Sequence, residues 1–182
     1  MIPKKPRRRC AAVIVLGVLL LAAGVCVAWR ALSRSLAEGR LAGQWEQVCN
    51  FRCPGCGTAM EALANLEITC ACGQAVKSSS GDRFGLIFRP ESRSVTVLRN
   101  GQPVASPAGA PPILYRVNWA KDPPALDLTI WTPEGRENRL KLLLRLDAEG
   151  RWIEIAGGGP RAGVRPPTFA GADVIRLRRT SP

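Results

Sequence analysis

Apolar and polar residues alternate along much of the second half of the chain. Val95 and Val97 are separated by Thr96, and Ile153 and Ile155 by Glu154. A period of two predicts strands with one buried and one solvated face, as antiparallel sheets have. The same alternation recurs at 115–119, 126–130 and 175–178, and turn-forming residues separate these segments at 100–101, 133–135 and 147–150.

The segment 140–146 (LKLLLRL) consists of good helix formers, but it has only seven residues between two turns. That length favours another strand over a helix. Six or seven strands are therefore predicted after residue 82, joined by short turns. The fold class is mostly β, an antiparallel meander that closes into a small barrel, because closure removes the exposed sheet edges that recruit other chains.

The segment 43–48 (GQWEQV) is the predicted first strand. A juxtamembrane helix is the alternative, because Leu41, Trp45 and Val48 also follow helical spacing, as do Leu32 and Leu36. We prefer the strand.

Residues 10–29 (CAAVIVLGVLLLAAGVCVAW) form an uncharged run of 20 residues. A helix of about 20 residues crosses the hydrocarbon core of a bilayer, so the run predicts a single transmembrane helix. A signal peptide cleaved after Ala28 is the competing interpretation, but the run exceeds the usual apolar region of about 7–15 residues. A lipoprotein signal ending at Cys26 is disfavoured by the bulky Val25 before it.

Charge sets the orientation of this predicted anchor. The chain has 26 basic and 14 acidic residues, a net charge of +12, and five of the basic residues precede the run. Only Arg30, Arg34 and Arg40 follow it closely, so the positive-inside rule places the N-terminus in the cytoplasm and the body outside. The other basic residues are spread along the chain and form no second block, so a nucleic-acid partner is not expected.

Two close pairs of cysteines, Cys53/Cys56 and Cys70/Cys72, lie thirteen residues apart. Four thiolates suit a tetrahedral zinc ion with a structural role, and nearby glycines allow the tight turns. The segment FRCPGCGTAMEALANLEITCACGQAVKS resembles zinc ribbons of the CPxCG…CxCG kind, although its second pair departs from the commoner CxxC spacing. Two disulfides, with Cys49 as an extra partner, or free thiols in a reducing compartment are the alternatives.

Several segments also resemble, in order, a family of small lipocalin-like domains found among uncharacterised planctomycetal proteins. The resemblance covers about residues 41–48 and 84–179, and its most specific pieces are PPALDLT (123–129) and RPPTF (165–169). It implies a lipocalin-like barrel in which Trp45 closes one end and packs under Arg176 or Arg178 of the last strand, a cation–π contact. It implies no activity and no particular ligand.

The expected organisation therefore has five parts. They are a basic cytoplasmic tail (1–9), a transmembrane helix (10–29), a juxtamembrane linker (30–40), a lipocalin-like barrel (41–48 plus 83–180) and a zinc-ribbon-like insertion (49–82).

The chain contains no histidine, which excludes Ser-His-Asp and Cys-His hydrolases, and no pair of carboxylates suggests catalysis. We therefore expect a membrane-anchored binding domain for a small apolar ligand, and not an enzyme. A structural component of the cell envelope that docks onto another protein is the alternative. A zinc-ribbon nucleic-acid binder is a third possibility, which would require cytoplasmic topology. An apolar cavity in the barrel would favour the first function, and a filled interior the second.

Overall fold

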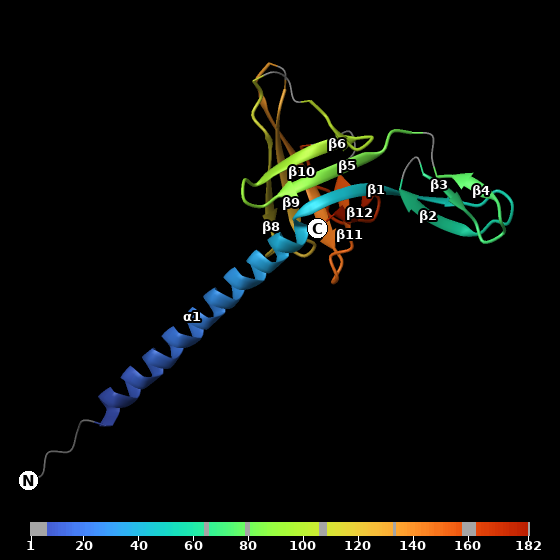
Figure 1. Cartoon of the computed structure of the whole chain (residues 1–182). Coiled ribbons are helices and arrows are strands. Elements are labelled where there is room, and N and C mark those ends of the chain that lie inside the picture. The colour runs from blue at the N-terminus through green and yellow to red at the C-terminus, as the bar shows by residue number, and fades with distance from the viewer. Residues whose placement is uncertain are drawn as a thin grey trace, which may run out of the picture. The chain divides into compact units, whose positions relative to one another are not determined.

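The computed structural model describes residues 7–63, 66–78, 81–105, 109–132, 134–157 and 163–181. The chain forms two compact units, Met1–Gly39 and Arg40–Pro182. The described part of the chain has one helix, most of which lies in the first unit. All the described strands lie in the second unit (Figure 1).

Helix α1 spans Arg7–Leu41. It includes residues 30–40, which the sequence predicted to be a linker, because that segment is rich in the helix formers Ala, Leu, Arg and Glu. The first six residues lie outside the described part of the chain, and so do the side chains of residues 7–19. No side chain of the predicted tail or of the first half of the predicted span is therefore described. In the part of the chain that is described, no helix combines the length and the apolar character needed to cross a bilayer.

Eight antiparallel strands close into a barrel, and each pairs with its neighbours in the order of the chain. They are β1 (Gly43–Arg52), β5 (Phe84–Arg89), β6 (Ser94–Arg99), β8 (Ile113–Asn118), β9 (Ala125–Trp131), β10 (Glu137–Leu146), β11 (Trp152–Gly157) and β12 (Asp173–Ser181). The barrel closes because β12 pairs with β1, for example Leu177 with Gln47. The predicted closed meander is confirmed, as are the strands predicted at 43–48 and 140–146.

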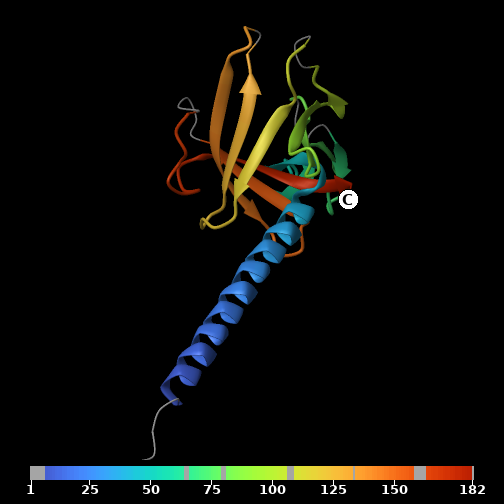
Figure 2. The same cartoon turned by 90° about the vertical axis from the view of Figure 1, so that its left-hand side faces the viewer.

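The two ends of the barrel differ. At one, which we call the closed end, β1 begins, β12 finishes, and short turns join β5 to β6, β8 to β9 and β10 to β11. At the other, the open end, lie the longer connections from β6 to β8 and from β11 to β12. Figure 2 shows the long strands of the barrel wall, coloured yellow to orange, standing side by side.

The hydrophobic core fills the closed half of the barrel. Its largest fully buried side chains include Trp45, Phe88 and Leu126. Phe88 packs edge-on against Tyr115, with ring centroids 5.2 Å apart and an angle of 89° between the rings. Aromatic pairs in this geometry add to the stabilisation from buried area.

The insertion between β1 and β5 lies at the open end. The second half of β1 leaves the barrel and pairs with β2 (Ala59–Leu63), from Val48 with Leu63 to Arg52 with Ala59. A second hairpin, β3 (Glu67–Thr69) and β4 (Ala75–Lys77), forms a separate two-stranded sheet. The insertion thus consists of two hairpins, and each of its hairpin turns carries one pair of cysteines.

Candidate metal centre and barrel cavity

The first pair of cysteines lies in the turn between β1 and β2. The amide of Cys53 donates to the carbonyl of Thr58 (2.9 Å), and the amide of Gly57 donates to the carbonyl of Cys53 (2.8 Å). Gly57 has a φ of 72°, which side chains other than glycine's rarely tolerate. These bonds fold the turn back on itself, so that the sulfurs of Cys53 and Cys56 both face the second hairpin.

The second pair lies in the turn between β3 and β4, which is closed by two similar backbone bonds, each spanning one residue fewer. The amide of Cys70 donates to the carbonyl of Gln74 (2.9 Å), and the amide of Gly73 donates to the carbonyl of Cys70 (2.8 Å). Gly73 has a φ of 86°. The CxC pair therefore lies in a turn that is one residue shorter than that of the CxxC pair but is closed in a similar way.

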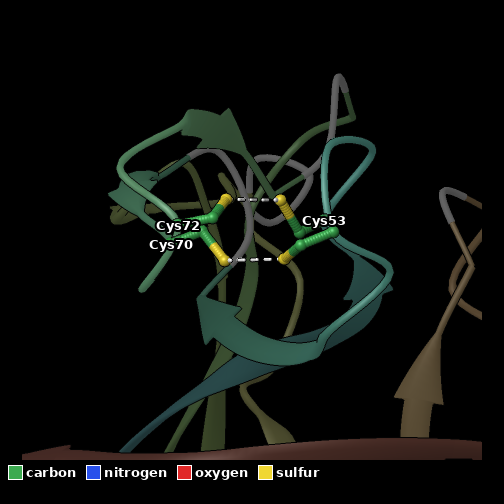
Figure 3. Close-up of side chains that lie close together, drawn as sticks. Cys53, Cys70 and Cys72 are labelled. Carbon is green, nitrogen blue, oxygen red and sulfur yellow. Dashed lines mark hydrogen bonds between the residues drawn. The ribbon is translucent and has the colours of Figure 1, made fainter.

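The four predicted ligand sulfurs of Cys53, Cys56, Cys70 and Cys72 converge within 4.8 Å of one another. The Cys53 and Cys72 sulfurs are 3.6 Å apart, and those of Cys56 and Cys70 3.5 Å apart (Figure 3). A tetrahedral ion with zinc–sulfur bonds of about 2.3 Å holds its sulfurs about 3.8 Å apart. A disulfide needs about 2.05 Å. The arrangement fits a metal ion, and the six cysteines whose side chains are described are all free thiols.

Cys53 and Cys70 are buried, whereas Cys56 and Cys72 are exposed. The hydroxyl and amide of Thr58 hydrogen-bond the Cys56 sulfur and, with Cys70 and Cys72, lower its pKa from 9.0 to about 6. For Cys70, the amide of Cys72 lowers the pKa, but the Cys56 sulfur, burial and the other two cysteines outweigh it and raise the pKa to about 12. At neutral pH, Cys56 is therefore a thiolate beside the thiol of Cys70. A soft cation that displaces the remaining protons would bind all four sulfurs.

Trp45 closes the barrel at the closed end and is fully buried. Its indole nitrogen donates to the carbonyl of Leu41 at 2.9 Å. The guanidinium of Arg179 lies over the ring, 4.7 Å from its centroid, and also donates to the carbonyl of Arg40. The first and last strands of the barrel thus meet at Trp45.

The arginine over Trp45 is Arg179, whereas the sequence had pointed to Arg176 or Arg178. The ladder explains the difference, because Trp45 lies directly opposite Arg179 and opposite residues share a face of the sheet. Arg178 is exposed on the outer face. Arg176 lies over the ring of Trp152, 4.8 Å from its centroid, and forms an ion pair with Glu61 of the insertion (3.3 Å). It therefore joins the insertion to the barrel wall.

The open half of the barrel encloses a cavity of about 510 Å³. Seven of the eight strands contribute to its lining, which is apolar apart from Asp173 at the start of β12. The lining residues are Phe84, Leu86, Val95, Val97, Ile113, Leu128, Ile130, Leu140, Leu142, Ile155, Gly157, Asp173, Ile175 and Leu177. The sequence identified several of these as inward-facing, but it could not show that they leave space between them.

The segments 123–129 and 165–169 meet on the outer face of the barrel. Arg165 donates to the carboxylate of Asp127 and, at 3.0 Å, to the carbonyl of Leu142. Arg145 lies over the ring of Phe169, 4.4 Å from its centroid, and pairs with Glu154 at 2.9 Å. These contacts attach the β11–β12 connection to the barrel wall and leave both carboxylates bound to arginine.

Comparisons with models of known protein families, with curated proteins and with solved structures found no match for this chain. The function must therefore be inferred from the barrel and the cysteine cluster themselves.

Proposed function

We propose that this chain is a membrane-anchored, non-catalytic binding domain, whose lipocalin-like barrel holds a small apolar ligand and whose insertion is a zinc ribbon. The observation that carries the proposal is the cavity of about 510 Å³ in the open half of the barrel. A scaffold that only docks onto other envelope proteins would have no use for an empty interior. Ligand sites typically have volumes of about 300–1,000 Å³ and mostly apolar linings.

The chemistry of the lining indicates the class of ligand. Among the described lining residues, Asp173 alone is ionisable, and none carries a hydroxyl or an amide in its side chain. A buried polar group without a hydrogen-bond partner costs roughly 2–7 kcal/mol, so sugars, nucleotides and peptides are poor occupants. A hydrocarbon chain or ring system fits.

The cysteine cluster supports a structural role for zinc. Four thiolates complete the tetrahedral shell of the ion and leave no position for a reactive water. The proposed ligands are Cys53, Cys56, Cys70 and Cys72, which the two hairpin turns bring together. Cys49 is outside the cluster and should be dispensable.

The proposed anchor is the uncharged run at 10–29, with the basic tail in the cytoplasm and the barrel on the extracytoplasmic side. The run belongs to a continuous helix, α1. The chain then enters the barrel at its closed end, and the cavity lies in the other, open half. A reporter fused after Ser181 would test the orientation, since reporter activity in the cytoplasm would refute it.

A photoreactive ligand tests the binding function directly. The full chain in lipid nanodiscs is exposed to a 10-carbon alkyl carboxylate that carries a diazirine, and the labelling is measured by mass spectrometry. We expect saturable labelling of the barrel strands. Leu140→Trp, which fills part of the cavity, should reduce it at least tenfold, whereas Ala148→Trp in the exposed turn before β11 should not. Labelling that does not saturate, or that is equal in all three proteins, would refute the proposal.

A further inference from the structure

The wall of the barrel is incomplete between β6 and β8. These strands share only two residue pairs, Ser94 with Leu114 and Val95 with Ile113. Beyond them, the edge of β6 is taken by β7 (Gln102–Pro103), and the amide of Val104 donates to the carbonyl of Val97 (2.9 Å). The next strand of the barrel therefore cannot pair with this part of β6.

Proline explains why β8 begins so late. Pro111 and Pro112 directly precede Ile113, and proline has no amide hydrogen to donate to a ladder. On the other side of the gap, the pairing of β8 with β9 reaches only Leu114 with Thr129. In the described part of the chain, the last two residues of β9, Ile130 and Trp131, thus have no partner on β8.

A groove of about 310 Å³ lies at this gap. It is lined by Thr96 and Val97 of β6 and by Ile130 and Trp131 of β9. Consecutive residues of a strand point to opposite faces. A groove lined by consecutive residues of β6 and of β9 therefore lies at the edges of these two strands. Val95 of β6 and Ile113 of β8 also line it, and the rest of the lining comes from the β6–β8 connection, including Ala110.

The groove and the cavity share four lining residues. Val95, Val97, Ile113 and Ile130 line both. Among the described residues that line the groove, only Thr96 carries a hydroxyl, which already accepts a hydrogen bond from the Arg89 guanidinium at 2.6 Å. The groove lining is therefore mostly apolar, although more polar than that of the cavity.

We infer that the groove is a second compartment of the same binding site, and that the ligand is an amphiphile whose single long alkyl chain passes from the cavity through the gap into the groove. This inference rests on the proposed binding function. A rigid ring system that fills the cavity has no segment that can follow the gap between two strands, whereas a flexible alkyl chain does. Chain length should then decide affinity: a short chain needs the cavity alone, and a long one needs both compartments.

Photoreactive alkyl carboxylates of 10 and 18 carbons test this in the full chain in nanodiscs. Ala110→Trp should block the groove, and Ala110 belongs to no residue pair of the barrel sheet. Leu140→Trp should block the cavity. Ala148→Trp is the control for an added indole. Each methylene excluded from the groove should weaken binding about fourfold. Ala110→Trp should therefore raise the half-saturating concentration of the 18-carbon probe at least tenfold and leave that of the 10-carbon probe within about twofold.

A second measurement locates the chain. The diazirine is placed near the head of one 18-carbon probe and at the tail of another. One of the two should label the segment 109–113, and the other should label β11 or β12.

The outcomes separate the two proposals. If Ala110→Trp binds both probes as the unmodified chain does, or weakens both equally, the groove is not a compartment for the chain, although the cavity is still a ligand site. If neither probe labels the unmodified chain saturably, the binding function itself is wrong. Loss of 18-carbon binding alone, with labelling of 109–113, supports the inference.

Discussion

The barrel and the cysteine-bearing insertion belong to one compact unit, but they are stabilised in different ways. The barrel buries large apolar side chains from every strand around Trp45 and Phe88. In the described part of the insertion, residues 49–63, 66–78 and 81–82, only Cys53, Cys70 and Ser78 are buried. Two of these three are proposed metal ligands.

This difference indicates what each region needs to fold. A segment of about 30 residues cannot bury enough apolar surface to offset its conformational entropy, and metals or disulfides usually supply the rest. The barrel has enough apolar residues to fill its closed half and still line an empty cavity in its open half. A void in a core is destabilising, so the cavity points to a use in binding.

Removal of the metal should have the largest effect, and it should be confined to the insertion. Structural zinc sites contribute apparent free energies of about 10–16 kcal/mol near pH 7. We expect Cys53→Ser, or a chelator, to expose the amides of β2, β3 and β4 to rapid hydrogen exchange while the barrel strands stay protected. Metal analysis should give about one zinc per chain, lost in Cys53→Ser and kept in Cys49→Ser. Unchanged exchange in the metal-free protein would contradict this.

Truncation of Trp45 should damage the barrel and leave the metal site intact. Replacing a fully buried aromatic side chain by alanine costs about 3–5 kcal/mol. Trp45→Ala should therefore lower the free energy of unfolding of the barrel by about that amount in denaturant titrations. Trp29→Ala is the matched control, because Trp29 lies in α1 and is not part of the barrel core, so its removal should change the free energy of unfolding of the barrel by less than about 0.5 kcal/mol. Equal effects of the two substitutions would refute the closure at Trp45.

Thr58 is only two residues from Cys56, so their contact within the first turn does not depend on the second hairpin, and the acidity of Cys56 should be visible in the metal-free chain even when the two hairpins open. Because the folded state lowers its pKa from 9.0 to about 6, mainly through Thr58, the thiolate favours the folded state above pH 9. That contribution declines below pH 9 and is lost as the pH falls through about 6. Iodoacetamide should label Cys56 at a constant rate from pH 7 to 9, falling about tenfold per unit below pH 6. In Thr58→Val, the rate should instead keep rising towards pH 9. The same rise in the unmodified chain would contradict the lowered pKa.

The smallest effect is expected at the arginine over Trp45. A cation–π contact is worth about 0.5–2 kcal/mol, so Arg179→Gln should lower the free energy of unfolding by about 1 kcal/mol. The neighbouring Arg178 is exposed on the outer face, and Arg178→Gln should change it by less than about 0.5 kcal/mol. A larger loss in Arg178→Gln than in Arg179→Gln would reverse the assignment.

Local patterns were sufficient to predict seven of the eight barrel strands and the cysteine cluster, but not β5 or the hairpin strands of the insertion. Alternation at Val95/Val97 and Ile153/Ile155 identified the inward faces, and the paired cysteines identified the sulfurs that converge. The same alternation could have identified Arg179, because it has the same parity as the inward-facing Leu177, whereas Arg176 and Arg178 do not.

The cavity and the gap could not be predicted, because they depend on how strands far apart in the chain are arranged. Whether inward side chains fill a barrel depends on its diameter and on the order in which strands pair. The short β6–β8 ladder depends on β7 occupying the edge of β6. Pro111 and Pro112 were a visible local signal for that gap, but only the strand order shows which two strands they separate.

The central claim is that the open half of the barrel holds an apolar ligand, and native mass spectrometry of the full chain tests it most directly. The chain is released from nanodiscs in the presence of octadecanoate, and the bound fraction is measured for the unmodified chain and for Leu140→Trp. Our account predicts one octadecanoate per unmodified chain and almost none in Leu140→Trp. No bound octadecanoate in the unmodified chain, or equal binding in both proteins, would contradict it.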